Sequence, residues 1–133
     1  MSRPRLIIFS DLDGTLLDHE SYDWSPAQPA MKRLNASDIP VVLNSSKTAG
    51  EIRALRQQMG NTAPFIVENG AAVVVPANCF GADREQVTSF GASRAQVLAH
   101  LAALREEGFA FIGFADMTVA ELDQQARLPE AQA

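Results

Sequence analysis

The sequence has few of the residues that build disulfides, metal clusters or basic surfaces. Cys79 is the single cysteine in 133 residues, which excludes an internal disulfide and a cysteine-based zinc site within the chain. Only Lys32 and Lys47 are lysines and the formal net charge is -5, so no basic run is present to bind nucleic-acid phosphates. His19 and His100 lack a partner at metal-ligand spacing. We therefore expect small molecules rather than nucleic acid as partners.

Long hydrophobic runs are also absent. The apolar stretch at residues 6–9 is too short for a signal-peptide core or a membrane span, and acidic residues follow it. We therefore expect neither export nor a membrane partner, and a single cysteine fits the reducing cytoplasm. The hydrophobic content of 47% predicts an ordinary buried core in a globular chain.

The first third of the chain predicts a βαβ unit. Residues 6–9 are continuously apolar, which is typical of a strand buried on both faces of a parallel sheet. Ser25 is the predicted N-cap of a helix over residues 26–34, and residues 39–43 predict the next strand. Because such crossovers join parallel strands, we expect the carboxyl ends of both strands at one edge of the sheet.

The pattern continues with a helix, a hairpin and a connection. Residues 48–51 form a capping-box pattern for a helix that stops at Gly60. The apolar residues 65–67 and 71–75 flank an Asn-Gly pair and predict a hairpin. Residues 76–91 carry two glycines, a proline and scattered charges, and they predict a connection between two structural parts.

These elements predict an α/β fold with a Rossmann-like parallel sheet. We assign residues 1–78 to the N-terminal part of this core and residues 79–133 to the beginning of an α+β cap domain. In the second part, a capping box starts a helix over residues 93–108, and the aromatic residues 109–114 predict a strand. A last short helix is expected from Thr118 to near Pro129.

Residues 11–15 (DLDGT) carry the clearest chemistry, because they directly follow the first predicted strand. The Asp11 carboxylate can attack phosphorus and so divide one hard displacement into two easier ones. Asp13, two residues further on, would reach the ester oxygen as a general acid and base. The repulsion between two anions requires a cation, and hard oxygen ligands suit Mg²⁺. The structural alternative is a strand that ends in a β-turn.

A second polar set follows the strand at residues 39–43. Ser45 could hydrogen-bond a phosphate oxygen, with support from the N-terminus of the next helix. Ser46 is the candidate if the register is off by one residue. Lys47 could orient the same phosphate or be solvated. Helix capping is the alternative role at this place, and we assign it to Thr48.

Residues 11–17 (DLDGTLL) resemble the first motif of the haloacid dehalogenase superfamily. The resemblance implies that Asp11 is the nucleophile and a Mg²⁺ ligand. It implies that Asp13 is the general acid and base and offers its backbone carbonyl to the metal. In addition to the two aspartates, we assign five residues to phosphate binding: Gly14, Thr15, Ser45, Ser46 and Lys47.

The wider pattern resembles one family within that superfamily, the mannosyl-3-phosphoglycerate phosphatases. Similar segments lie at residues 19–24 (HESYDW), 41–48 (VVLNSSKT), 65–71 (FIVENGA) and 113–118 (GFADMT). The resemblance implies hydrolysis of mannosyl-3-phosphoglycerate to mannosylglycerate and phosphate. The resemblance also implies that Glu68, Asn69 and Gly70 contact the substrate. A hairpin turn is the alternative explanation of these three residues.

Two elements that the superfamily needs are missing. No lysine follows Lys47 to offset the charge between nucleophile and phosphate, and no late acidic motif completes the Mg²⁺ site. The resemblance covers the N-terminal half of the family's length. We therefore expect an N-terminal fragment that is inactive alone. Its first strand would have an unpaired edge, so the fragment would self-associate or pair with the missing C-terminal half.

Two classes of function stay open. One is a Mg²⁺-dependent phosphatase acting on a small phosphate ester: mannosyl-3-phosphoglycerate, glucosyl-3-phosphoglycerate or a broad set of sugar phosphates, with a phosphomutase as a further rival. The other is a non-catalytic remnant that binds a phosphorylated ligand without turnover. The missing elements favour the remnant for this chain alone, whereas the intact first motif favours an origin in an enzyme.

Overall fold

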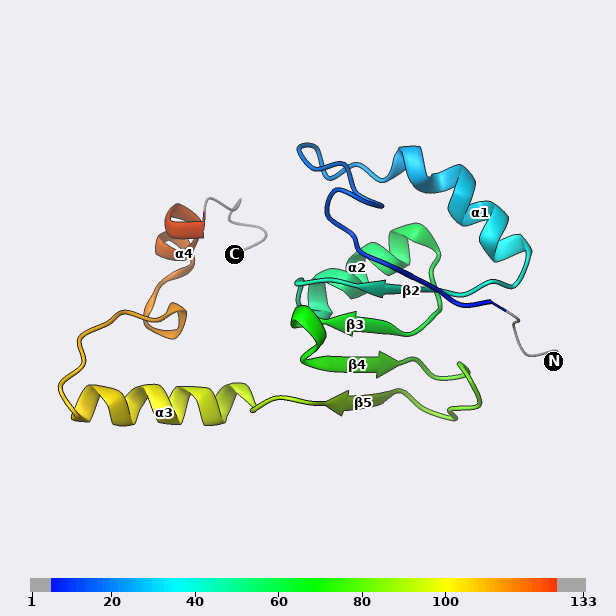
Figure 1. Ribbon diagram of the computed structural model, residues 1–133. Helices are drawn as coiled ribbons and strands as arrows, with labels where there is room; N and C mark the ends of the chain where they lie inside the picture. The colour runs from blue at the N-terminus through cyan, green and yellow to red at the C-terminus, as the bar shows by residue number, and fades with distance from the viewer. Residues whose placement is uncertain (1–5, 127–133) are drawn as a thin grey trace. The chain divides into compact units, whose positions relative to one another are not determined.

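The computed structural model describes residues 6–126, and their contacts divide the chain into two compact units (Figure 1). The first unit is Met1–Gly91 and the second is Ala92–Ala133. The first carries the sheet and all of the predicted site residues, so each unit is described by itself.

A five-stranded mixed sheet forms the first unit, in the order β1-β2-β3-β4-β5. The first three strands are parallel to one another, and the last two are added antiparallel. The α/β, Rossmann-like class is confirmed, with a parallel part of three strands. The strands are β1 (Ile8–Ser10), β2 (Val41–Asn44), β3 (Phe65–Val67), β4 (Ala72–Val75) and β5 (Gln86–Ser89).

The strand register brings the carboxyl ends of the parallel strands together. Ser10 of β1 lies opposite Leu43 of β2, and Asn44 of β2 lies opposite Ile66 of β3. The loops that follow β1, β2 and β3 therefore leave the sheet at the same edge, as the βαβ pattern predicted.

Helix α2 (Ala49–Met59) begins and ends as its sequence predicted. Thr48 Oγ1 accepts a hydrogen bond from the Glu51 amide, and Glu51 Oε2 accepts one from the Thr48 amide at 2.8 Å. Gly60 ends the helix in the left-handed conformation, with φ of 62°. The start of the helix, and with it the direction in which its first amides point, is thus set by local side chains.

Helix α1 (Gln28–Ala36) begins differently from the prediction. A 3₁₀ turn, η1 (Ser25–Ala27), precedes it, and Ser25 makes no capping bond. Instead, the Ser25 hydroxyl donates to Asp23 Oδ1 at 2.7 Å. The Ser25 amide also donates to Asp23 Oδ1, at 3.0 Å, so the Asp23 side chain is the acceptor at the start of this segment.

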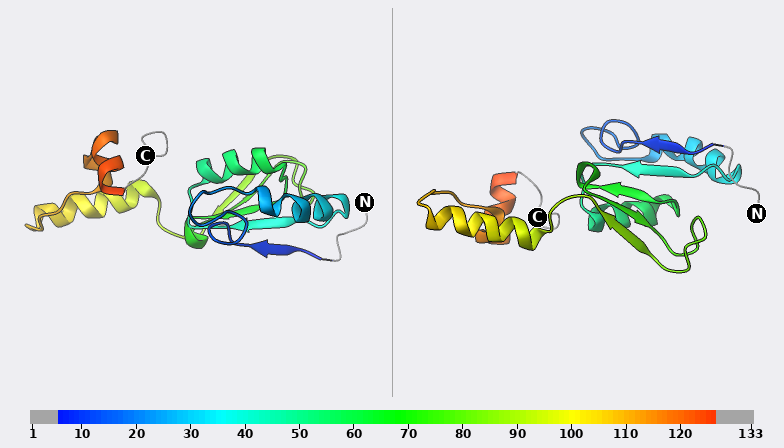
Figure 2. Two further views of the ribbon diagram at one scale, coloured as in Figure 1. Left: turned by 90° about the horizontal axis from the view of Figure 1, so that it is seen from above. Right: turned by 60° about the horizontal axis from the view of Figure 1, so that its bottom comes forward.

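The core lies between the sheet and these two helices (Figure 2). Met31 of α1 and Ile52 of α2 belong to one buried cluster with Leu43 and Phe65 of the strands. Burial of this cluster supplies the apolar stabilisation that holds the strand ends in place.

The first strand is not buried on both faces, which corrects the prediction. β1 is an edge strand, and Phe9 is 65% exposed. Within the first unit that face of β1 is uncovered, whereas the other face packs on the core through Ile8. The self-association that such an edge would favour stays a prediction.

The predicted connection at residues 76–91 contains a strand that the sequence did not indicate. β5 pairs antiparallel with β4, with Val73 opposite Thr88. All four β5 residues are exposed, so the strand depends on backbone pairing and has no hydrophobic alternation to predict it. The contacts of the chain divide after Gly91, whereas the predicted division lay at residue 78.

The second unit contains α3 (Arg94–Glu106), the 3₁₀ turn η3 (Phe114–Asp116) and α4 (Val119–Ala126). Both predicted capping boxes, at residues 93–96 and 118–121, are present. The predicted end of the last helix near Pro129 lies outside the described residues. No helix in the described part of the chain is long and apolar enough to cross a membrane.

The strand predicted at residues 109–114 is wrong. The segment is irregular and runs into η3. Arg105 pairs with Asp116 and lies 4.7 Å from the centroid of the Phe111 ring, so the arginine organises the segment locally. A strand needs a neighbour to pair with, and the described residues of this unit offer none.

Two phenylalanines of the sheet give a matched test of the core. Phe65 is fully buried and Phe9 is largely exposed. Phe65→Ala is expected to lower the free energy of unfolding by about 3–5 kcal/mol, and Phe9→Ala by less than about 0.5 kcal/mol. Urea titration followed by circular dichroism measures both. Equal losses would show that Phe65 is not in the core or that Phe9 is covered.

Candidate active site

The loop after β1 is a closed turn. The backbone amides of residues 15–17 all donate to the carbonyl of Leu12, at 2.8–3.1 Å, and the Gly14 amide donates to Leu17 at 2.9 Å. Gly14 has φ of 74°, a conformation that glycine adopts readily. Thr15 is exposed on this turn. Gly14 therefore allows the tight path of this turn.

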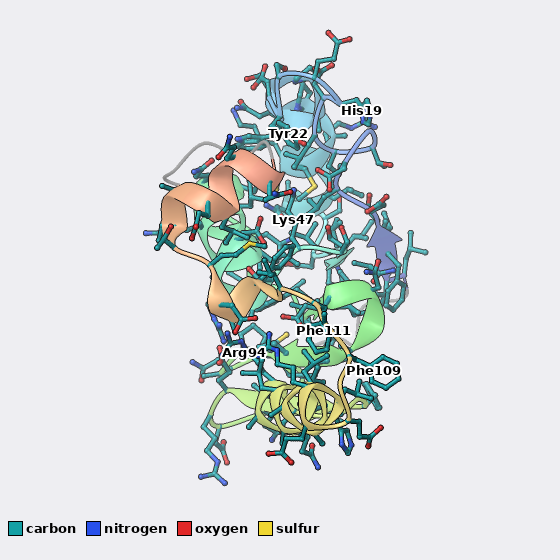
Figure 3. The ribbon with its side chains drawn as sticks, turned by 90° about the vertical axis from the view of Figure 1, so that its left-hand side faces the viewer. His19, Tyr22, Lys47, Arg94, Phe109 and Phe111 are labelled. Carbon is teal, nitrogen blue, oxygen red and sulfur yellow. The ribbon has the colours of Figure 1, made fainter. Side chains whose placement is uncertain are left out.

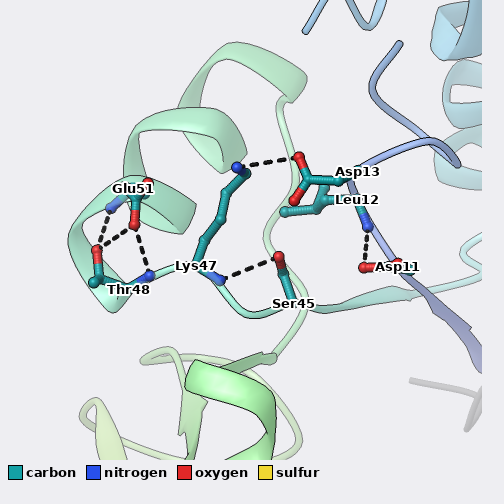
Figure 4. A network of polar contacts seen from close by, with 7 residues as sticks. All are labelled: Asp11, Leu12, Asp13, Ser45, Lys47, Thr48 and Glu51. Carbon is teal, nitrogen blue, oxygen red and sulfur yellow. Dashed lines mark hydrogen bonds and ion pairs between the residues drawn. The ribbon is translucent and has the colours of Figure 1, made fainter. Parts of the chain in front are cut away.

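Burial of Leu12 separates the two aspartates from the core. Leu12 is fully buried, while Asp11 before it is exposed and Asp13 after it is partly exposed. The two carboxylates therefore lie away from the core on either side of one anchoring side chain, as their spacing predicted. Asp11 Oδ1 also accepts a hydrogen bond from the Leu12 amide at 2.7 Å, which fixes the orientation of that carboxylate (Figure 4).

The loop after β2 presents Ser45 to the same edge. Ser45 is 4% exposed, and its amide donates to the Ile66 carbonyl of β3 at 3.2 Å. Ser45 Oγ accepts a hydrogen bond from the Lys47 amide at 3.3 Å. Ser46, the alternative candidate, is exposed. The structure therefore places Ser45, and not its neighbour, within the packed strand end.

The turn after β3 docks on this second loop. The Glu68 amide donates to the Lys47 carbonyl at 3.0 Å, and the Asn69 amide donates to the Ser45 carbonyl at 3.1 Å. The hairpin between β3 and β4 is confirmed. Its connection is a 3₁₀ turn over residues 68–70, the three residues that the sequence placed in the turn, with left-handed φ at all three.

Lys47 reaches across to the first loop. Its Nζ atom lies 3.1 Å from Asp13 Oδ1, and the two side chains are 17% and 32% exposed (Figure 4). Asp13 Oδ1 is shielded from solvent and has no hydrogen-bond partner among the described residues, so the contact is an ion pair without hydrogen-bond geometry. Neither of the predicted roles of Lys47, orienting a phosphate or being solvated, included this contact.

Tyr22 is a site residue that the sequence reasoning missed. Lys47 Nζ lies 5.1 Å from the centroid of the Tyr22 ring, within the range of a cation–π contact (Figure 3). Tyr22 comes from the loop between β1 and α1 and has φ of 55°. A local signal existed, because Asp18 followed by Ser21 is a pattern that closes a turn through the aspartate side chain.

That turn is tightly hydrogen-bonded. Asp18 Oδ1 accepts from the amides of Glu20 and Ser21 and from the Ser21 hydroxyl, at 2.8–3.1 Å. These bonds to Ser21 are the main cause that lowers the pKa of the Asp18 carboxyl below its ordinary value. The Tyr22 amide in turn donates to the Asp18 carbonyl at 3.0 Å. The position of Tyr22 is therefore set by a charged, preorganised turn.

The donors at this edge suit a hard cation such as Mg²⁺. Asp11 is exposed, Asp13 Oδ1 has no hydrogen bond, and no backbone hydrogen bond among residues 6–126 ends on the Asp13 carbonyl. Mg²⁺ is held by one or two carboxylates and keeps several waters. No group of three or more acidic, histidine or cysteine residues gathers within the described range. The residues present therefore fit part of a Mg²⁺ site.

The fold and this edge define a class of protein: an α/β domain with polar side chains gathered at the carboxyl ends of its parallel strands, where ligands bind in such folds. The chain belongs to the haloacid dehalogenase-like hydrolase family, whose model matches residues 8–130.

Individual relatives agree with this assignment. The chain is 36% identical over 131 residues to a glucosyl-3-phosphoglycerate/mannosyl-3-phosphoglycerate phosphatase of Persephonella marina, covering 93% of this chain and 48% of that protein. The chain thus spans about half the length of the curated relative. Among solved structures, a hypothetical protein from Geobacillus kaustophilus has a TM-score of 0.59 at 27% identity, covering 79% of this chain and 38% of that one.

A second solved structure supports the fold alone. A haloacid dehalogenase-like hydrolase from B. subtilis has a TM-score of 0.56 at 22% identity, covering 76% of this chain and 33% of that chain. The likeness therefore concerns the fold of the chain.

Gly14 and Gly50 give a test of the first loop. A Cβ at Gly14 would meet only His19 Nδ1, at 3.9 Å, so any cost comes from the backbone conformation. We expect Gly14→Ala to lower the free energy of unfolding by about 1–2 kcal/mol. Gly50→Ala, in the first turn of α2, is expected to have no effect or to stabilise by up to about 1 kcal/mol. Thermal and urea unfolding measure both, and a neutral Gly14→Ala would contradict the left-handed turn.

Proposed function

We propose that the chain provides the nucleophile, the acid–base residue and a phosphate contact of a Mg²⁺-dependent phosphatase. The observation that carries the proposal is the gathering of Asp11, Asp13 and Ser45, from the loops after β1 and β2, at one edge of the parallel strands. The Leu12 amide holds Asp11, and Lys47 contacts both other side chains. Membership of a hydrolase family supports the same reading.

Asp11 would act as the nucleophile. Its exposed carboxylate attacks phosphorus, the bond from phosphorus to the ester oxygen breaks, and an aspartyl-phosphate forms. Asp13 donates a proton to the departing oxygen and then takes a proton from the water that hydrolyses the intermediate, which returns both residues to their starting states. The bond from the Leu12 amide to Asp11 Oδ1 holds the nucleophile in one orientation.

Ser45 would contact the phosphoryl group. Its Oγ atom already accepts the Lys47 amide, so its hydroxyl hydrogen is directed elsewhere and can donate to a phosphoryl oxygen. Gly14 and Thr15 on the first turn are further proposed substrate contacts, and so are Glu68, Asn69 and Gly70 on the turn after β3. Ser46 is the alternative to Ser45 and is not included.

Mg²⁺ would be held by the Asp11 carboxylate and the Asp13 carbonyl, and when bound it would neutralise charge on the phosphoryl oxygens. Further ligands would have to come from segments such as those that make up the rest of the longer relative. For that reason we propose that residues 6–126 alone bind a phosphate ester without turnover.

We propose mannosyl-3-phosphoglycerate as the substrate, on the basis of the relative from Persephonella marina, whose name also includes glucosyl-3-phosphoglycerate. The proposed setting is the cytoplasm, with a small phosphate ester as partner. The second unit would be the beginning of a cap domain. A panel of phosphate esters tested on the full-length protein distinguishes these substrates, and equal rates on all of them would contradict a specific one.

Removal of the nucleophile is the first test. Asp11→Asn in the full-length protein is expected to abolish turnover, because an amide cannot form the acyl phosphate. Asp38→Asn is the matched control, since Asp38 lies in an exposed turn before β2 and has a left-handed φ that asparagine tolerates. Release of phosphate is measured. Retained turnover in Asp11→Asn would remove Asp11 from its proposed role.

The two neighbouring serines test the phosphate contact. Ser45→Ala is expected to lower kcat/KM by about a hundredfold, the size of effect seen when one donor to a transition-state oxyanion is lost. Ser46→Ala, at an exposed site, is expected to change kcat/KM by less than about twofold. The reverse ranking of the two variants would assign the contact to Ser46.

A further inference from the structure

Lys47 differs from an ordinary surface lysine in that both ends of it are held. Its amide donates to Ser45 Oγ at 3.3 Å and its carbonyl accepts from the Glu68 amide at 3.0 Å, so its backbone is fixed between two loops. At the other end, Nζ contacts Asp13 Oδ1 at 3.1 Å. Only 17% of the Lys47 side chain is exposed, so few of its rotamers are accessible.

Tyr22 restricts the same ammonium group from a third direction. The ring centroid is 5.1 Å from Lys47 Nζ, and the ring comes from a turn that Asp18 closes with three hydrogen bonds. Three separate segments, after β1, before α1 and after β2, thus converge on one charge. Holding one ammonium group between three segments costs chain entropy.

We propose that Lys47 is a positioning residue for Asp13, and that Tyr22 holds Lys47 in place. The inference rests on the proposed phosphatase function. Asp13 Oδ1 is shielded and lacks a hydrogen bond of its own, so Lys47 is the group that orients this carboxyl. In the chemical step, the proton passes from Asp13 to the departing ester oxygen as the bond to phosphorus breaks. Lys47 does not touch the reacting atoms in this scheme.

This role predicts a defect that depends on the leaving group. The alkoxide that departs from a sugar phosphate ester requires the proton from Asp13, whereas 4-nitrophenolate departs without one. Loss of Lys47 should therefore slow the first reaction more than the second. A lysine that bound the phosphoryl group would slow both reactions equally and raise KM, because both substrates carry the same phosphoryl group.

The experiment compares Lys47→Met with Lys32→Met in the full-length protein. Lys32 is the other lysine of the chain and is exposed on α1. For the alkyl phosphate that the unchanged protein hydrolyses fastest, Lys47→Met is expected to lower kcat by roughly tenfold to a hundredfold with KM nearly unchanged. For 4-nitrophenyl phosphate the loss should be below about threefold. Lys32→Met should match the unchanged protein on both substrates.

Two further variants keep the test decisive if Lys47→Met does not fold. Tyr22→Leu removes the aromatic face from an exposed position and should reproduce part of the leaving-group-dependent loss, while Tyr22→Phe retains the face and should not. In an Asp13→Asn background, Tyr22→Leu should cause no additional loss.

An equal loss on both substrates, or an additional loss in that background, would overturn the inference. Absence of any phosphatase activity in the unchanged protein would overturn the proposed function as well.

Discussion

Parallel pairing of β1 with β2 is the constraint on which the candidate site depends. In the observed register Ser10 lies opposite Leu43, so the next residues of both strands leave the sheet side by side. A shift of one residue would turn Leu12 out of the core and the aspartates into it. Because Leu12 is fully buried, the apolar core resists that shift and thereby fixes where the carboxylates lie.

Electrostatics sets the second condition. The chain has a formal net charge of -5, and its proposed ligand is also an anion, so the edge that gathers Asp11 and Asp13 must be offset locally. Lys47 supplies one such charge within the described residues, and it is held by Asp13 and the Tyr22 ring. The proposed Mg²⁺ would supply the rest.

Local rules predicted the parts of the fold that depend on local interactions. The Thr48 capping box and the βαβ pairing follow from short-range sequence patterns, and the structure bears them out. β5 was missed because a strand that is exposed throughout is held by backbone pairing, which leaves no hydrophobic pattern. The strand predicted at residues 109–114 failed for the reverse reason: aromatic side chains favour a strand, but pairing requires a neighbour.

The candidate site divides in the same way. Asp11, Asp13 and Ser45 could be predicted, because each directly follows a strand whose apolar residues mark its end. The Lys47–Asp13 pair and the Tyr22 contact could not, because they join segments through side-chain reach that depends on the three-dimensional path of two loops. Left-handed φ at Glu68 and Asn69 belongs to this second group, since docking on the loop after β2 imposes it.

The most direct measurement is chemical trapping of the covalent intermediate. The full-length protein is mixed with Mg²⁺ and a phosphate ester that it hydrolyses, quenched in acid during turnover, and mapped by peptide mass spectrometry. Our account predicts a phosphoryl group on Asp11 in the peptide that contains residues 11–15. Turnover accompanied by a phosphoryl group on a different residue would contradict the account.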